Sequence, residues 1–123
     1  MGVKFCAVAI APDEQYRYDG TCISLGFTYE DSFFKGYECF TYFDQFYFDL
    51  LDKIKLLIRT QEGEFRLFDV GGDTDGFIDF YYSQRVLNIE GCLGSSTSDF
   101  SLRFRFRADQ TLLSLLLSCI GLT

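Results

Sequence analysis

The segment 69–79 concentrates the acidic side chains that are best placed to bind a cation. If it is counted as a calcium loop that begins at Gly71, then Asp73 and Asp75 fall on ligand positions. The first position is then Gly71 instead of Asp, and the last is Tyr82 instead of the bidentate Glu that such loops need. Because Gly supplies positive φ and Asp tolerates the left-handed region, we favour a plain hairpin turn here.

Histidine is absent, which removes Ser–His–Asp and Cys–His nucleophile systems together with His ligands for zinc. The cysteines contain no C-x-x-C pair, and each lies in or beside an apolar run: Cys6, Cys22, Cys39, Cys92 and Cys119. We interpret them as buried free thiols of a reducing compartment. Carboxylate pairs suited to glycoside hydrolysis must exist among 18 acids, but no spacing singles one out. We therefore expect no catalytic, cofactor-binding or metal-binding residue, and a protein that is not an enzyme.

Three arginines alternate with phenylalanines in 100–107, and Arg103, Arg105 and Arg107 share one face of a predicted strand. Such a row suits a phosphate- or RNA-binding strip. It also suits a solvated sheet face on which the arginines pair with acids of neighbouring strands, such as Glu90 or Asp79. Platforms for single-stranded RNA present aromatic rings on the face that meets the bases. The phenylalanines here point the other way, so we favour the solvated face.

Composition and charge limit the class of partner. The chain has 123 residues, of which 48% are hydrophobic and 19% aromatic, so it can fold as one domain, 1–123, around a sizeable core. Its net charge of −7 argues against nucleic acid and anionic membranes as partners and fits a basic protein partner. The start of the chain does not favour a signal peptide, and the apolar run 112–117 is too short to span a bilayer. We expect a cytoplasmic protein.

Hydrophobic periodicity predicts strands grouped apart from helices. The predicted strands cover 4–11, 20–29, 37–42, 65–70, 77–82, 86–91 and 100–107. The predicted helices cover about 44–60 and 110–119. This order indicates an α+β fold: an antiparallel sheet of about six to seven strands, with the long helix packed on it and a short C-terminal helix.

Both helices carry start signals. We expect Asp44 to cap the first helix and Asp109 to cap the second, which ends at Gly121. Apolar residues of the first helix recur every three or four positions and predict one buried stripe: Phe46, Tyr47, Leu50, Leu51, Ile54 and Leu57. The chain has 8 tyrosines, too many for one core of this size, so we expect most of them to be partly exposed.

The segment 100–113 reads Phe-Ser-Leu-Arg-Phe-Arg-Phe-Arg-Ala-Asp-Gln-Thr-Leu-Leu. It resembles the closing strand and helix of the WapI-like bacterial immunity proteins, in which an F-x-F strand runs into T-D-Q-T-x-L. Ala108 stands where that family usually has the first Thr, and the Gly-His often found in its middle is missing. The order of the other elements is compatible with the family: an early hairpin, a helix around 44–59, and a Gly-containing meander.

The resemblance implies a protein that binds the C-terminal domain of a polymorphic or contact-dependent growth-inhibition toxin and blocks its activity. Many such toxins are nucleases with basic active-site clefts, and the acidic charge of this chain agrees with such a partner. The family implies no catalytic residue and no cofactor. The expected mechanism is electrostatically steered occlusion of the toxin's active site, without direct contact to nucleic acid or membrane.

Density of acidic charge gives the predicted contact residues. They come from the 62–79 segment and from one turn: Glu62, Glu64, Asp69, Asp73, Asp75, Asp79, Glu30 and Asp31. Two alternatives remain. One is a protein-interaction module with no toxin, such as a dimer-forming domain, which the neighbouring genes would distinguish. The other is a small-ligand-binding domain, which a thermal-shift screen would detect because selective binding to the folded state raises the melting temperature.

Overall fold

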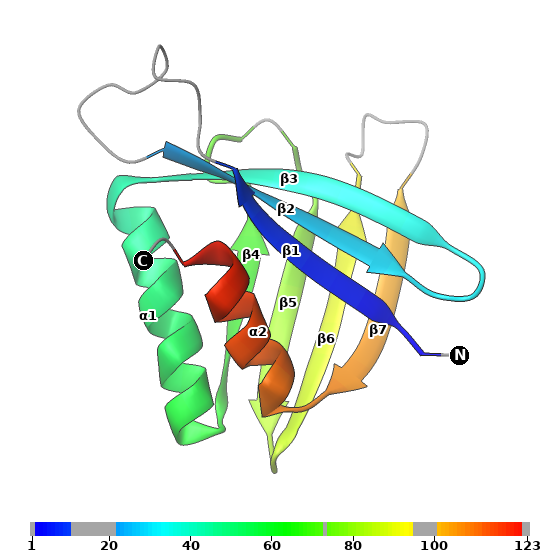
Figure 1. Ribbon diagram of the computed structural model, residues 1–123, viewed down its shortest axis with the longest axis vertical. Coiled ribbons are helices and arrows are strands. Elements are labelled where there is room, and N and C mark those ends of the chain that lie inside the picture. The colour runs from blue at the N-terminus through cyan, green and yellow to red at the C-terminus, as the bar shows by residue number, and fades with distance from the viewer. Residues whose placement is uncertain (1, 11–21, 73, 95–100, 122–123) are drawn as a thin grey trace.

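The computed structural model describes residues 2–10, 22–72, 74–94 and 101–121. In that part of the chain the fold is α+β, with antiparallel strands and two helices (Figure 1). The elements are β1 (Lys4–Ile10), β2 (Cys22–Glu30), β3 (Lys35–Phe43), α1 (Asp44–Thr60), β4 (Gly63–Phe68), β5 (Phe77–Ser83), β6 (Val86–Leu93), β7 (Leu102–Ala108) and α2 (Gln110–Ile120). Every predicted strand and helix is present, with bounds shifted by a few residues. No helix among these residues is both long and apolar enough to cross a membrane.

The strands form two sheets instead of the one that we expected. Their orders are β1-β2-β3 and β4-β5-β6-β7, and every pairing is antiparallel. The chain leaves β3 directly into α1, so β4 begins a new sheet instead of pairing with β3. Figure 1 shows β1–β3 crossing one end of the four-stranded sheet, while α1 and α2 cover the rest of the same face.

The core lies between these layers and is rich in aromatic rings. Tyr29 of β2 stacks on Phe104 of β7 with ring centroids 4.4 Å apart. The ring centroid of Phe5 in β1 lies 6.2 Å from that of Phe27 in β2 and 5.7 Å from that of Phe106 in β7, so the Phe5 ring contacts both sheets. Because strand side chains alternate between faces, the same strands turn their polar residues toward solvent.

The tyrosines are more buried than we expected. Among the described residues, Tyr29, Tyr42, Tyr47 and Tyr82 are buried, whereas Tyr37 and Tyr81 are exposed. The expectation was wrong because a buried Tyr is accommodated once its hydroxyl has a partner. The Tyr47 hydroxyl, for instance, donates to the Ile120 carbonyl at 2.7 Å and thereby joins α1 to α2. Tyr16 and Tyr18 lie outside the described residues.

Of the two predicted helix N-caps, the one at Asp109 is confirmed and the one at Asp44 is wrong. Asp109 is the N-cap of α2, and its carboxylate accepts a hydrogen bond from the Thr111 N–H at 2.9 Å, as predicted. The N-cap of α1, however, is Phe43, which makes no side-chain cap bond, and Asp44 is the first helical residue. The extended backbone of β3 ends at Phe43, with φ −146° and ψ 155°, and Asp44 is already helical, so the helix begins one residue earlier than an Asp44 cap requires.

The apolar stripe of α1 is largely confirmed. Tyr47, Leu50, Ile54 and Leu57 are buried and Leu51 is partly buried, but Phe46 is 52% exposed. The helix ends at Gln61, which adopts the left-handed conformation and donates its N–H to the Leu57 carbonyl. The two helices and β1–β3 thus cover one face of the four-stranded sheet. Within the described ranges, no other element covers the opposite face of this sheet.

Candidate protein-binding surface

The solvent-facing side of the four-stranded sheet is the candidate site, and we call it the outer face. Its side chains come from alternate positions of β4, β5, β6 and β7, and the strand register places them in three rows. The rows are Glu64–Tyr81–Asn88–Arg107, Arg66–Asp79–Glu90–Arg105 and Phe68–Phe77–Cys92–Arg103. Each row therefore contains one residue from each strand, and each ends on an arginine of β7.

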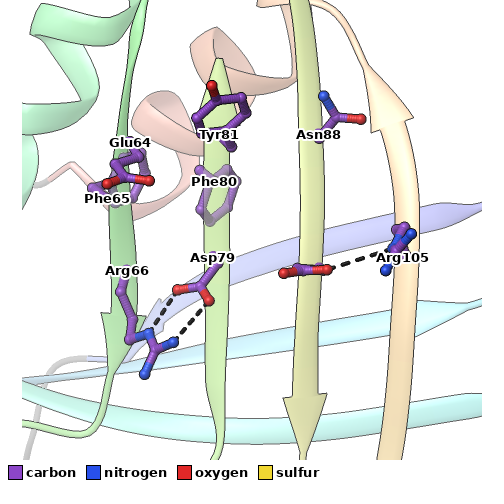
Figure 2. Close-up of a pocket in the computed structure, with 9 residues that line it drawn as sticks. Glu64, Phe65, Arg66, Asp79, Phe80, Tyr81, Asn88 and Arg105 are labelled. Carbon is purple, nitrogen blue, oxygen red and sulfur yellow. Dashed lines mark hydrogen bonds and ion pairs between the residues drawn. The ribbon is translucent and has the colours of Figure 1, made fainter. Parts of the chain in front are cut away.

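Ion pairs order the middle row, as Figure 2 shows. Asp79 accepts two hydrogen bonds from Arg66, from Nε at 2.6 Å and from Nη2 at 2.9 Å. The Arg66 guanidinium also lies 4.3 Å from the centroid of the Phe77 ring, a cation–π geometry. Arg105 Nε is 3.4 Å from Glu90 Oε2, a looser pair between two exposed side chains. The solvated-face hypothesis is thus confirmed for Glu90, whereas Asp79 pairs with Arg66 and not with an arginine of β7.

A depression of about 600 Å³ lies over the middle of the outer face (Figure 2). Its volume is within the range of ligand-binding pockets. The outer-face side chains that line it are Glu64, Arg66, Asp79, Tyr81, Asn88, Glu90 and Arg105. Tyr81 is 52% exposed, which leaves a large ring available for contact. Glu64 forms no ion pair within the described part of the chain, and the only partner of Glu90 there is the loosely held Arg105.

Residue types on the outer face match those that protein interfaces select. Arginine and aromatic residues are enriched in interface cores, whereas lysine is depleted. The twelve positions of the three rows include four arginines and three aromatic residues, and none is lysine. Arg103 and Arg107 are exposed and form no ion pair with any described residue, so their charges are available to a partner.

The predicted contact acids of the 62–79 segment do not all reach this surface. Glu64 and Asp79 lie on the outer face, and Glu62 is exposed just before β4. Asp75 is exposed in the connection between β4 and β5, and Asp73 lies outside the described residues.

Asp69 was expected to be an exposed charge, but it is 7% exposed. Its carboxylate accepts hydrogen bonds from the Thr41 N–H at 2.7 Å and the Thr74 N–H at 3.2 Å. Through these bonds Asp69 links the β4–β5 connection to β3. The Asp69 carboxylate must be buried to reach both N–H groups. Asp69 therefore has a structural role, and the segment 69–76 is more than the plain hairpin turn that we favoured.

Glu30 and Asp31 lie at the β2–β3 hairpin, away from the outer face. One Asp31 oxygen accepts from the N–H groups of Phe33 and Phe34, both at 2.8 Å, and the other accepts from the Tyr29 hydroxyl at 2.6 Å. The Tyr29 hydrogen bond and those two backbone bonds lower the pKa of Asp31. These bonds hold the turn in shape, so those of the predicted acids that the structure describes do not form one continuous surface.

Tyr81, Asn88 and Arg66 were missing from the predicted contacts. Period-two alternation already placed Tyr81 on the face of Asp79, and Asn88 on the face of Glu90. The missing information was the register that aligns β4, β5 and β6. With the register known, these residues become direct neighbours.

The cysteines are free, as predicted, wherever the structure describes their side chains. Their burial was wrongly predicted, because Cys6 and Cys119 are exposed and Cys39 and Cys92 are partly buried. Cys39 Sγ lies 2.8 Å from the Tyr37 hydroxyl. Among the described residues, no three Cys, Asp or Glu side chains are grouped to hold a metal ion.

No protein-family model matches the chain, and the searches of curated proteins and of solved structures also found no match. The class that the structure itself defines is an α+β domain of two antiparallel sheets and two helices.

Proposed function

We propose that this protein is a non-catalytic, cytoplasmic immunity protein that binds and neutralises a cognate bacterial toxin domain, and that the outer face is its binding surface. The toxin would be a nuclease with a basic active site. The observation that carries the proposal is the depression on the outer face, where Glu64 lies beside the exposed Tyr81 and Glu90 lies in the neighbouring row. A basic loop of the toxin would enter this depression and lose access to its own substrate.

Charge and contact area have separate roles in this mechanism. The net charge of −7 favours encounter with a basic partner and would raise the association rate. Tyr81 would supply the central contact, because an exposed aromatic ring buries a large area and loses few rotamers on binding. Glu64 and Glu90 would select a basic side chain. The C-terminal motif supports the family, while its Asp109 cap serves the fold and not the contact.

The first experiment is a pull-down with the tagged protein, using the product of the adjacent gene and native cell extract in parallel. We expect one stoichiometric basic partner whose nuclease activity disappears in the complex. A chain that captures no partner, beside genes with no toxin, would contradict the immunity proposal.

Two substitutions then test the surface. Tyr81→Ala should raise the Kd for the partner about 30-fold or more if Tyr81 is a central anchor, which corresponds to at least about 2 kcal/mol. Glu64→Lys should slow association and reduce its dependence on salt. The matched controls are Tyr37→Ala, at a tyrosine of nearly equal exposure on the other sheet, and Asp52→Lys on α1. Equal losses in Tyr81→Ala and Tyr37→Ala would place the interface elsewhere.

A second candidate function is small-ligand binding, which the size of the same depression favours. A thermal-shift screen with common metabolites and metals tests it. Stabilisation by one compound that is lost in Tyr81→Ala, together with failure to capture a protein, would favour this function over immunity.

A further inference from the structure

The strand β7 has an edge that pairs with no other strand in the described part of the chain. It hydrogen-bonds to β6 on one side, and it is the last strand of its sheet (Figure 1). An unpaired edge presents backbone N–H and C=O groups that can accept another extended segment. Such strand addition is a common way in which proteins bind peptides.

A groove of about 440 Å³ lies beside this edge, between the beginning of β1 and the end of β7. Its lining is mainly apolar and includes two cations but no acid: Val3, Lys4, Phe5, Cys6, Phe106, Arg107, Ala108 and Leu112. The rings of Phe5 and Phe106 pack against each other with centroids 5.7 Å apart. Apolar side chains of an added segment would find matching surface here.

The outward side of the same edge is positively charged. Arg103, Arg105 and Arg107 are exposed at every second position of β7, so successive side chains stand roughly 6.6 Å apart along the strand. A second strand has the same repeat. Acidic residues at every second position of an added strand would therefore lie opposite the arginines, and the residues between them would face the groove.

We propose that the free edge of β7 binds an extended segment of a partner protein in which acidic and apolar residues alternate. The acidic side chains pair with Arg103, Arg105 and Arg107, and the apolar side chains enter the groove against Phe5 and Phe106. Backbone hydrogen bonds supply affinity that is independent of sequence, and the two kinds of side chain supply specificity.

A second copy of this chain is a poor occupant of the same edge. Antiparallel pairing of β7 with its copy would set arginine against arginine, and like charges on opposing strands destabilise a sheet. The arginine row thus prevents self-association, as charged residues often do on edge strands, while leaving the edge open to an acidic strand. This inference goes beyond the proposed function, because it holds whether or not the partner is a toxin.

The probe for the test is a fluorescently labelled heptapeptide of alternating glutamate and valine. Fluorescence anisotropy with the full chain should show saturable binding. The variant Arg103→Glu/Arg107→Glu should weaken it roughly tenfold or more, because each change replaces an attraction by a repulsion. The control Lys53→Glu/Lys55→Glu makes the same change in charge at exposed positions of α1 and should bind as the wild type does. Should the glutamate variant fail to fold, Arg103→Gln/Arg107→Gln removes both charges without reversal.

Backbone methylation separates strand addition from simple attraction of charges. An added strand pairs through only one of its edges, so its amides alternate between bonded and free. Two versions of the heptapeptide carry N-methyl groups at alternate residues, one at the odd and one at the even positions. We expect one version to lose binding and the other to keep it.

Three results would overturn the proposal. The first is no binding of the heptapeptide. The second is equal binding of both methylated versions. The third is tighter binding of a single-stranded oligouridylate with loss in Arg103→Glu/Arg107→Glu, which would make the arginine row a nucleic-acid strip. None of these results bears on Tyr81 or Glu64, so the outer-face depression is tested independently.

Discussion

The solvent-facing sides of the two sheets differ in what they offer a partner. The outer face of the four-stranded sheet carries arginines, acids and exposed aromatic rings around a depression. The corresponding side of the three-stranded sheet has mostly small or weakly polar residues at its centre: Cys6, Val8, Ser24, Gly26, Thr28, Tyr37, Cys39 and Thr41. Both sheets are antiparallel and both bury one side, so the pairing pattern does not cause the difference.

One exposed residue, Tyr37, packs across the middle of the smaller sheet. The Tyr37 side chain lies across Gly26, and a Cβ added there would stand 2.7 Å from the Tyr37 hydroxyl oxygen and 3.2 Å from Val8. The same hydroxyl lies 2.8 Å from Cys39 Sγ. On the outer face, Tyr81 and Glu64 are both exposed and line the depression. This difference is the reason that we propose the outer face, and not the solvent-facing side of the smaller sheet, as the binding surface.

The largest expected loss of stability comes from removing the Asp69 carboxylate, which links the four-stranded sheet to β3. Asp69→Ala removes the carboxylate that accepts from Thr41 of β3 and from Thr74, leaving a buried N–H unpaired. Hydrogen bonds to charged groups contribute about 1.5–3 kcal/mol each, so we expect a loss of about 3 kcal/mol in the free energy of unfolding. Urea denaturation measures it. Asp75→Ala, an exposed neighbour in the same connection, is the control and should cost far less.

Alkaline pH should weaken the same junction. Burial, together with the charge of Asp69, raises the pKa of Tyr42 to about 12, from an ordinary value of 10.0. Because the folded-state pKa is the higher one, this contribution to stability is complete below pH 10 and is lost as the pH rises from 10 toward 12. A pKa difference of about two units corresponds to roughly 3 kcal/mol in the free energy of unfolding.

Tyr42→Phe provides the measurement for this titration. At pH 8 the variant should be less stable than the wild type, because Tyr42 accepts a hydrogen bond from the Phe68 N–H at 3.1 Å. Urea denaturation at a series of pH values should show the gap narrowing above pH 10. A gap that stays constant up to pH 12 would mean that the folded protein does not disfavour the tyrosinate.

One glycine in each sheet allows the space above the two strands to be compared: Gly91 of β6 and Gly26 of β2. A Cβ at Gly91 of β6 would lie 2.6 Å from the Phe77 carbonyl oxygen and 2.9 Å from the Phe104 ring, and backbone cannot move aside easily. We expect Gly91→Ala to cost about 2 kcal/mol through overpacking. At Gly26 an added Cβ meets two side chains and no backbone, Tyr37 at 2.7 Å and Val8 at 3.2 Å, and the gain of about 0.5–1 kcal/mol from replacing a strand glycine offsets much of that clash. Thermal denaturation of both variants should therefore give a clear loss in Tm for Gly91→Ala and little change for Gly26→Ala.

Local features of the fold were predictable from the sequence, whereas features that depend on distant partners were not. The Asp109 cap follows from residues two positions apart, and the α1 stripe follows from a repeat of three and four. The role of Asp69 depends on Thr41, which is 28 residues away. The local sequence, a stretch of Asp and Gly typical of a turn, therefore did not indicate that role. The division into two sheets likewise depends on which strands pair, and alternation within each strand carries no such information.

The candidate site shows the same limit. Glu64 and Asp79 were predicted as contacts from charge density, and both lie on the outer face. Tyr81 was not selected, because it lies in a run of three aromatic residues, and the sequence alone does not show which strands pair with this run or which residues lie beside Tyr81. Residue type identifies candidates for an interface, but register decides which of them are neighbours.

Breaking the ion pair on the outer face itself should have only a small effect on stability. Asp79→Ala breaks the bidentate pair with Arg66, whose side chain is 56% exposed, and exposed pairs contribute about 1 kcal/mol or less. We expect a loss of that size by urea denaturation, and a smaller one for Glu30→Ala on the other sheet, where Glu30 lies between Lys4 and Lys35 without an ion pair among the described residues. Since the outer face then tolerates substitution at little cost in folding, a large loss of partner binding in Asp79→Ala reports recognition. If Asp79→Ala instead unfolds the protein, the middle row is structural, and the case for the outer face must rest on Tyr81 and Glu64 alone.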